Sequence, residues 1–166
     1  MARNACLSAC FVLLVFATAQ GGVRLTTLPP PLYLHVQTDD PHTALLDPDP
    51  TVREEAILRF GAFGDEASFR VLEQALIDPE PRVREAAVSA LADAGGEAAA
   101  RVLAFALGDD DPAVREEAVY ALGEIGNEIA FELLHRALGD ETGSVRESAA
   151  QLLDELRPRL AAQSRP

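Results

Sequence analysis

The sequence lacks lysine and tryptophan, and it contains only two cysteines, Cys6 and Cys10. Because both cysteines lie within the first ten residues, neither a disulfide framework nor a cysteine metal site is available to the rest of the chain. Aromatic residues make up only 5% of the 166 residues, so any core must be built largely from Ala, Leu and Val. Such a core favours closely packed helices over a β-sandwich.

The absence of lysine leaves 14 arginines as the only basic residues, against 27 acidic residues and a formal net charge of −13. A chain this acidic is repelled by the phosphates of nucleic acids and by anionic membrane surfaces. We therefore expect neither nucleic acid nor a membrane surface as a partner. Apolar residues account for 48% of the chain, which is enough for the core of one ordinary domain.

The first twenty residues have the order of a secretory signal peptide. A positive start at Arg3 precedes an apolar run, and Ala17-Thr18-Ala19 supplies the small residues of a cleavage site. Residues 1–19 are therefore predicted to be removed near Ala19, and the protein to be exported to the periplasm or outside the cell. An uncleaved membrane anchor is the alternative.

Residues 20–44 differ in composition from the rest of the chain. Paired glycines and the run Pro29-Pro30-Pro31 predict a linker or a short extended segment. A local group of residue types that can bind metal occurs there: His35, Asp39, Asp40 and His42. Its spacing matches no established metal motif, so a solvated surface is favoured, and we predict neither a metal nor another cofactor.

From about residue 45 onward the sequence repeats itself every 31 residues. The positions that recur in register are Asp47, Asp78, Asp109 and Asp140; Val52, Val83, Val114 and Val145; Arg53, Arg84, Arg115 and Arg146; Glu54, Glu85, Glu116 and Glu147; Ala56, Ala87, Ala118 and Ala149; Gly64, Gly95 and Gly126; and Leu76, Leu107 and Leu138. A period of this length is the signature of a repeat architecture.

Each repeat contains two helical patterns, which are clearest in the third. Asp111-Pro112 supplies an N-cap and a proline at the first helical position, and Gly126 ends that helix. A second helix is predicted over about residues 128–138. The residues expected to face inward are Val114, Ala118, Ala121, Leu122 and Ile125 on the first helix, and Ala130, Phe131, Leu134, Ala137 and Leu138 on the second.

Three complete helix pairs fit between residues 50 and 138, and a closing helix is predicted over about residues 144–156. Arg157-Pro158 is expected to end that helix, which leaves residues 158–166 as a tail. Residues 41–46 have the pattern of a remnant of a preceding second helix. We thus predict an all-α fold over residues 45–157, an α–α superhelix of about three and a half helix pairs.

The recurring string Asp-x-Asp/Glu-Pro-x-Val-Arg-Glu-x-Ala, followed later by a small residue and Gly, resembles the short HEAT repeat. The likeness is to the subtype named after phycobilisome lyases, and it covers about residues 45–156. It implies a solenoid whose second helices line a concave face. The fourth repeat departs from the pattern, because Thr142-Gly143 stands where Asp/Glu-Pro is expected.

An Asp and an Arg stand six positions apart in every repeat, namely Asp47 with Arg53, Asp78 with Arg84, Asp109 with Arg115, and Asp140 with Arg146. A catalytic acid–base pair is needed once rather than four times. The repetition therefore favours a structural role, and the resemblance implies a ladder of Arg–carboxylate contacts that joins one turn to the next.

The resemblance also offers enzymes for comparison. Deoxyhypusine hydroxylase, which has repeats of this type, places His-Glu pairs after the Val-Arg of its repeats to hold iron. The matching positions here are Glu54-Glu55, Glu85-Ala86, Glu116-Glu117 and Glu147-Ser148. None carries histidine, and an exported chain is poorly placed for the work of bilin lyases in the cytoplasm. We therefore predict that the chain is not an enzyme.

The outward positions of the second helices vary between repeats while the core positions stay constant. We predict that these positions bind the partner: Arg70, Glu73, Gln74, Arg101, Phe105, Glu132, His135 and Arg136, with the smaller Ala104 among them. Phe105 is the strongest candidate, because an exposed aromatic among charged residues makes a good anchor. His135, beside Arg136, is interpreted as a surface residue rather than a metal ligand.

The sequence therefore predicts a non-catalytic scaffold or adaptor that acts in the cell envelope or outside the cell. It is expected to bind a protein or peptide on its concave face. The alternatives are a lyase-type enzyme or enzyme-maturation factor, and a membrane-tethered assembly factor that retains its N-terminal segment.

Overall fold

The computed structural model describes residues 41–60 and 64–163, all within residues 37–166, the second of two units into which the chain divides. The described part is helical: α1 (Pro41–Ala44), α2 (Pro50–Phe60), α3 (Glu66–Ala75), α4 (Pro81–Ala94), α5 (Gly96–Ala106), α6 (Pro112–Ile125), α7 (Glu128–Ala137) and α8 (Gly143–Gln163). None of these helices is both long and apolar enough to cross a membrane. The expected signal peptide, most of the linker, His35, Asp39 and Asp40 lie outside the described residues.

The start of α6 lies where the sequence predicts it, and side-chain caps also begin α3 and α7. Asp111 accepts a hydrogen bond from the backbone N–H two residues on, and Pro112 is the first residue of α6. Asn127 and Asp65 cap α7 and α3 through the backbone N–H three residues on. Gly126 ends α6 with a φ of 59°, a left-handed conformation that glycine adopts without strain.

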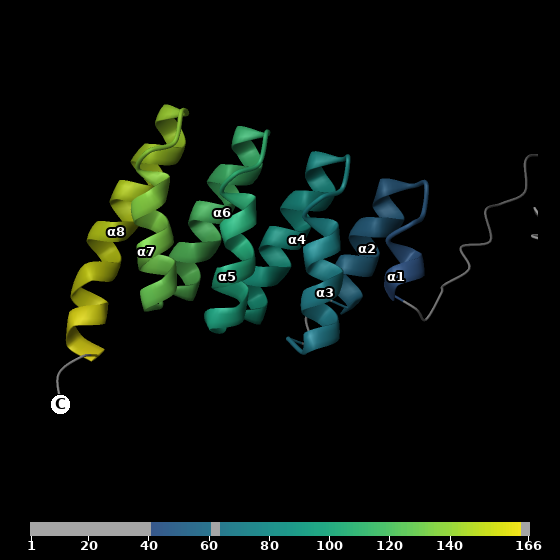
Figure 1. The fold of residues 1–166 in the computed structure, drawn as a ribbon, viewed down its shortest axis with the longest axis horizontal. Coiled ribbons are helices and arrows are strands. Elements are labelled where there is room, and N and C mark those ends of the chain that lie inside the picture. Colours follow the sequence, from purple (N-terminus) through teal and green to yellow (C-terminus); the bar gives the residue numbers. More distant parts are fainter. Residues whose placement is uncertain (1–40, 61–63, 164–166) are drawn as a thin grey trace, which may run out of the picture. The chain divides into compact units, whose positions relative to one another are not determined.

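The helix pairs stack in chain order. The first helices α2, α4, α6 and α8 contact one another in succession, and the second helices α3, α5 and α7 do the same. Figure 1 shows the second helices as a row in front of the first helices. Three complete pairs and one closing helix are therefore confirmed. The one-turn α1 contacts α2, as expected for the remnant of a preceding second helix, although it occupies the end of the segment assigned to the linker.

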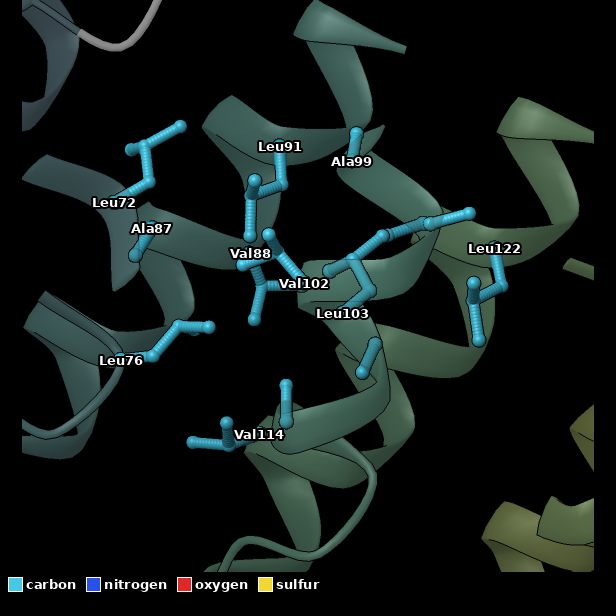
Figure 2. Close-up of a cluster of buried hydrophobic side chains, with 14 of the residues drawn as sticks. Leu72, Leu76, Ala87, Val88, Leu91, Ala99, Val102, Leu103, Val114 and Leu122 are labelled. Carbon is cyan, nitrogen blue, oxygen red and sulfur yellow. The ribbon is translucent and has the colours of Figure 1, made fainter. Parts of the chain in front are cut away.

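A continuous apolar core fills the space between the two rows, and Figure 2 shows its central part between α3 and α6. Leu72 and Leu103 of the second helices and Leu91 and Leu122 of the first helices are fully buried. Each side chain of this size contributes about 1.5–3 kcal/mol when it is removed from water. Since no single helix covers its own apolar stripe, stacking of the repeats is what stabilises them.

One residue expected to face inward does not. Leu138 is 39% exposed, whereas Leu76, which occupies the same position two repeats earlier, is 8% exposed. Leu76 is covered because a further complete helix pair follows it, while only α8 follows Leu138. Leu133, which is 8% exposed, is instead the additional buried leucine of α7.

The predicted end of the closing helix at Arg157-Pro158 is also wrong, because α8 continues through Pro158 to Gln163. Proline has a φ that suits a helix and costs one backbone hydrogen bond when it lies inside one. Leu153 and Leu156, just before it, are 3% and 1% exposed. Their packing holds the helix firmly up to the proline, so the loss of one hydrogen bond near the end is tolerated.

Arginines join the successive turns between repeats. Arg84 donates from Nε and Nη2 to the two carboxylate oxygens of Asp109, at 2.7 and 2.8 Å. Its Nη1 donates to the backbone carbonyl of Asp78 at 2.8 Å. Arg53 and Arg115 repeat this arrangement with the carboxylates of Asp78 and Asp140. The expected ladder is therefore confirmed for Arg53, Arg84 and Arg115. Arg146, which no further repeat follows, donates instead to the backbone carbonyls of Asp140 and Glu141.

The ladder has a connectivity that the six-residue spacing does not reveal. The aspartate six positions before each arginine accepts through its backbone carbonyl, as Asp109 does from Arg115 at 2.7 Å. The carboxylate partner is the aspartate of the following repeat, 25 positions on, as in the pair of Arg84 and Asp109. Arg53, Arg84 and Arg115 therefore each tie their own turn to the next one.

Candidate protein-binding site

The residues predicted to bind a partner all lie on α3, α5 and α7. We call them the second-helix surface, comprising Arg70, Glu73 and Gln74 on α3, Arg101 and Phe105 on α5, and Glu132, His135 and Arg136 on α7. All eight are exposed. They occupy equivalent positions on helices that contact their neighbours, so the structure brings them into one continuous surface. That this surface is concave stays a prediction.

Two of the three arginines on this surface are already paired. Arg101 donates to Glu97 at 3.0 Å, one helical turn earlier, and Arg70 is paired with Glu66 in the same way. Pairs this exposed contribute about 0.3–0.5 kcal/mol to stability. They still lower the positive charge that these two arginines present, so the second-helix surface is less basic than the sequence suggests.

The ring of His135 lies against Phe131 on α7. The ring centroids are 4.8 Å apart, and the planes are nearly perpendicular at 85°. This edge-to-face arrangement is a favourable geometry for two aromatic rings. Because Phe131 is partly buried against the core, the contact fixes the direction of an otherwise exposed imidazole.

A hollow of about 730 Å³ opens at the C-terminal ends of α3 and α5. We call it the turn hollow. It is lined by Glu73, Leu76, Ile77, Asp78, Pro79, Arg84, Phe105, Gly108, Asp109 and Asp110. Only Glu73 and Phe105 of the second-helix surface reach it, so the remaining predicted residues lie outside it.

The floor of the turn hollow is held in place by the arginine ladder. Arg84 lies in its lining and joins Asp109 to the backbone carbonyl of Asp78. Burial disfavours the charged form of Asp109, but hydrogen bonds from Arg84 and from the backbone N–H of Asp111 outweigh it, so the pKa of Asp109 lies below the ordinary value. This carboxylate therefore stays ionised and bound to Arg84 at neutral pH.

Two large apolar side chains of the turn hollow are exposed to water. Ile77 is 81% exposed and Phe105 is 74% exposed, while Leu76 beside them in the lining is 8% exposed. Exposed apolar side chains that adjoin a depression are a common mark of a protein-binding surface.

Sequence reasoning missed Ile77, Pro79 and Asp110. A signal for Ile77 was present in the repeat alignment. Its position is occupied by the exposed Leu46 in the preceding repeat, but by Gly108 and Gly139 in the next two, where glycine suits a solvated turn. A branched apolar residue at such a position has no local structural reason, which identifies it as a candidate for contact with a partner.

On the first helices, two glutamates at the positions that the resemblance matches to iron-binding pairs form contacts with neighbouring helices. Glu116 accepts hydrogen bonds from the hydroxyls of Ser144 and Ser148 at 3.1 and 3.2 Å, and so attaches α8 to α6. Glu54 pairs with Arg82 at 3.0 Å. Within residues 41–60 and 64–163, no group of three or more His, Cys, Asp or Glu residues is arranged to hold a metal ion.

Comparison with known proteins identifies the repeats. Residues 40–110 and 78–154 match a family model described as HEAT repeats. The structure of human deoxyhypusine hydroxylase in complex with glycerol is similar, with 29% identity, a TM-score of 0.63, and coverage of 74% of this chain and 45% of that one. An engineered protein matches at 23% identity and a TM-score of 0.49, over 71% of this chain and 61% of its own. The chain thus spans less than half of the hydroxylase chain, and no curated protein matches the sequence.

Proposed function

The chain belongs to the HEAT-repeat family, since residues 40–110 and 78–154 match its repeats, and we propose that it is a non-catalytic scaffold that binds another protein. The contact is made through the second-helix surface. The structure contributes a rigid frame, and the exposed side chains on it provide recognition.

The observation that carries this proposal is the contrast between constant core positions and variable surface positions. Leu72, Leu103 and Leu134 are identical in the three repeats and fully buried. Gln74, Phe105 and Arg136 occupy an equivalent exposed position two residues further along each helix. These last three offer an amide, an aromatic ring and a cation in order. A frame that repeats and a surface that does not are what recognition of one particular partner requires.

We place this binding in the cell envelope or outside the cell. The support is the order of charge, apolar run and small residues in residues 1–19. The mass of the chain recovered from its native cells tests the point. A chain that begins near Gln20 supports export with cleavage, whereas the full-length mass supports a membrane-tethered assembly factor instead.

An enzymatic role is the second candidate, because the hydroxylase whose structure is similar is an enzyme. The positions Glu54-Glu55 and Glu116-Glu117, which match iron-binding pairs in the resemblance, hold carboxylates but no histidine. Metal analysis of the chain purified without chelators tests this candidate. Stoichiometric iron that survives dialysis would favour the enzyme over the scaffold.

The scaffold is best tested by site-specific photo-cross-linking in the cells that produce the protein. A photoreactive amino acid is placed at Phe105 or Arg136 on the second-helix surface. Matched control positions are Leu58 and Tyr120 on the first helices, which are 69% and 46% exposed. Substitution at any of these exposed positions is expected to leave the fold unchanged.

We expect cross-links to the same discrete partner from Phe105 and Arg136, and none from the two control positions. Cross-links from Leu58 and Tyr120 alone would move the binding face to the first helices. If no position yields a partner, the scaffold proposal is wrong and metal or small-ligand binding should be examined.

A further inference from the structure

The turn hollow combines an apolar centre with an acidic edge. Ile77 and Phe105 come from neighbouring repeats and line the same depression, in which both are mostly exposed. An apolar side chain of a partner that packs against them would remove its own surface and the surfaces of Ile77 and Phe105 from water. Burial of this kind at the centre of a contact gives the largest share of binding energy.

The charges that line the hollow are mostly negative. Glu73, Asp78, Asp109 and Asp110 contribute four carboxylates, and Arg84 contributes one guanidinium. The carboxylates of Asp78 and Asp109 are bound by ladder arginines. Glu73 and Asp110 are exposed, and neither forms an ion pair within the described part of the chain.

The unneutralised carboxylates select for a cation. Glu73 lies on α3 and Asp110 in the turn before α6, so they come from different repeats and both line the hollow that holds Ile77 and Phe105. The face of an exposed aromatic ring such as Phe105 also attracts guanidinium and ammonium groups. The net charge of −13 adds a long-range attraction for a basic segment.

We propose that the turn hollow binds a segment of the partner protein in which an apolar side chain stands next to an arginine or lysine. This inference rests on the scaffold function and names the chemistry of its partner. The apolar side chain packs between Ile77 and Phe105, and the cation contacts Glu73 or Asp110. A second copy of this chain is disfavoured as the occupant, because it brings another net charge of −13 to an acidic surface.

The combination of residues occurs at one level of the described repeats. One level earlier, Leu46 stands in the place of Ile77, but Gln74 stands in the place of Phe105. At the next pair of repeats, Gly108 stands in the place of Ile77 and Arg136 in the place of Phe105. Ala104 replaces Glu73 there, so the exposed apolar side chain of Ile77, the aromatic ring of Phe105 and one carboxylate have no counterparts at that level. The helices and their core repeat, but this set of side chains does not. A partner that recognises it can therefore bind at only one position along the described repeats.

The test is a selection of random peptides displayed on phage against the full chain. Selected peptides are then synthesised and titrated against variants by fluorescence anisotropy. The test variants are Ile77→Asp and Phe105→Ala, and the matched control is Leu58→Asp, an exposed leucine on α2. All three substitutions are at sites that are at least 69% exposed, so each variant is expected to fold.

We expect the selected peptides to share an apolar residue beside an arginine or lysine. Affinity should fall at least about tenfold for Ile77→Asp and for Phe105→Ala, and stay within about twofold for Leu58→Asp. The double variant Glu73→Gln/Asp110→Asn should bind more weakly and depend less on salt, because it removes two of the charges that salt screens.

Other outcomes would overturn the inference in distinguishable ways. Peptides that ignore Ile77→Asp but are lost with Arg136→Glu would keep the scaffold and reject the turn hollow. Peptides without a basic residue would reject the proposed chemistry. Self-association of the wild type that Ile77→Asp abolishes would make a second copy the occupant. If the selection and the cross-linking both yield nothing, the scaffold function fails as well.

Discussion

Gly123 on α6 and Leu152 on α8 pack directly against each other. A Cβ atom added to Gly123 would lie 2.6 Å from Cδ2 of Leu152 and 2.9 Å from Cδ1, which is closer than carbon atoms can approach. The equivalent positions one repeat earlier are Ala92 and Ala121. At the contact with the closing helix, the pair of alanines is therefore replaced by a glycine and a leucine.

This exchange predicts the behaviour of a double-mutant cycle. Gly123→Ala forces Leu152 to move, and overpacking of this kind costs about 1–3 kcal/mol, of which the better helix propensity of alanine offsets about 0.5–1 kcal/mol. In a Leu152→Ala background the same change recreates the alanine pair of the preceding repeat. We therefore expect Gly123→Ala to destabilise the wild type and to be neutral or stabilising in that background. Urea unfolding of the four proteins measures this, and equal effects in both backgrounds would contradict it.

Arg84 and Arg82 make a matched pair for measuring the ladder. The side chains of Arg84 and Asp109 are 13% and 9% exposed, whereas those of Arg82 and Glu54 are 50% and 27% exposed. Arg84→Met leaves a largely buried carboxylate without its partner, which costs about 3–5 kcal/mol. Arg82→Met removes a surface pair and should cost about 0–1 kcal/mol. Thermal denaturation compares the two, and a similar loss for both would mean that the ladder contributes no more than an ordinary surface pair.

The lowered pKa of Asp109 predicts how its contribution depends on pH. Because the folded pKa lies below the unfolded value of about 3.9, the ionised carboxylate stabilises the fold fully above about pH 4. That contribution is lost as the pH falls through the folded pKa.

The difference in unfolding free energy between the wild type and Asp109→Asn is the quantity to follow. It should be constant from neutral pH to about pH 5 and shrink below about pH 4. The many other carboxylates titrate in both proteins and largely cancel. A difference that grows on acidification would have the wrong sign for a carboxylate held ionised.

Two prolines predict opposite effects of the same substitution. Pro158 lies inside α8, where the ring removes a backbone hydrogen bond, so Pro158→Ala should stabilise the last turns and slow amide exchange there. Pro112 is the first residue of α6, where its fixed φ is favourable. Pro112→Ala should therefore cost about 0.4–1 kcal/mol. Hydrogen exchange and urea unfolding test the pair, and faster exchange after Pro158→Ala would contradict the assignment.

Much of the fold was predictable because the signals act over a few residues. Asp111 and Gly126 begin and end α6 as expected, since capping depends on backbone groups within one turn. The period of 31 residues then transferred that result to every repeat. The failures lie at the end of the array. Leu138 was expected to be buried like its counterparts in the middle repeats, but fewer helices follow it. Pro158 was expected to end its helix as it would in an isolated one, but packing of the preceding residues holds the helix in place.

The candidate site was predictable in part. The outward positions of α3, α5 and α7 follow from helical periodicity, so none of the eight predicted residues is buried. Ile77 was missed because it lies in a turn, where periodicity says nothing about what a side chain faces. Its place beside Phe105 depends on how one repeat stacks on the next.

The sequence by itself determined that this protein is an all-α HEAT-repeat chain with three helix pairs, a closing helix and an arginine in every repeat. These features follow from local backbone preferences and from a pattern repeated often enough to exceed chance. Only the tertiary structure decided that Arg84 holds the carboxylate of Asp109 and that Ile77 and Phe105 share one hollow. The reason is that contacts between repeats depend on the register in which helices stack, which is set by the volumes of all the packed side chains together.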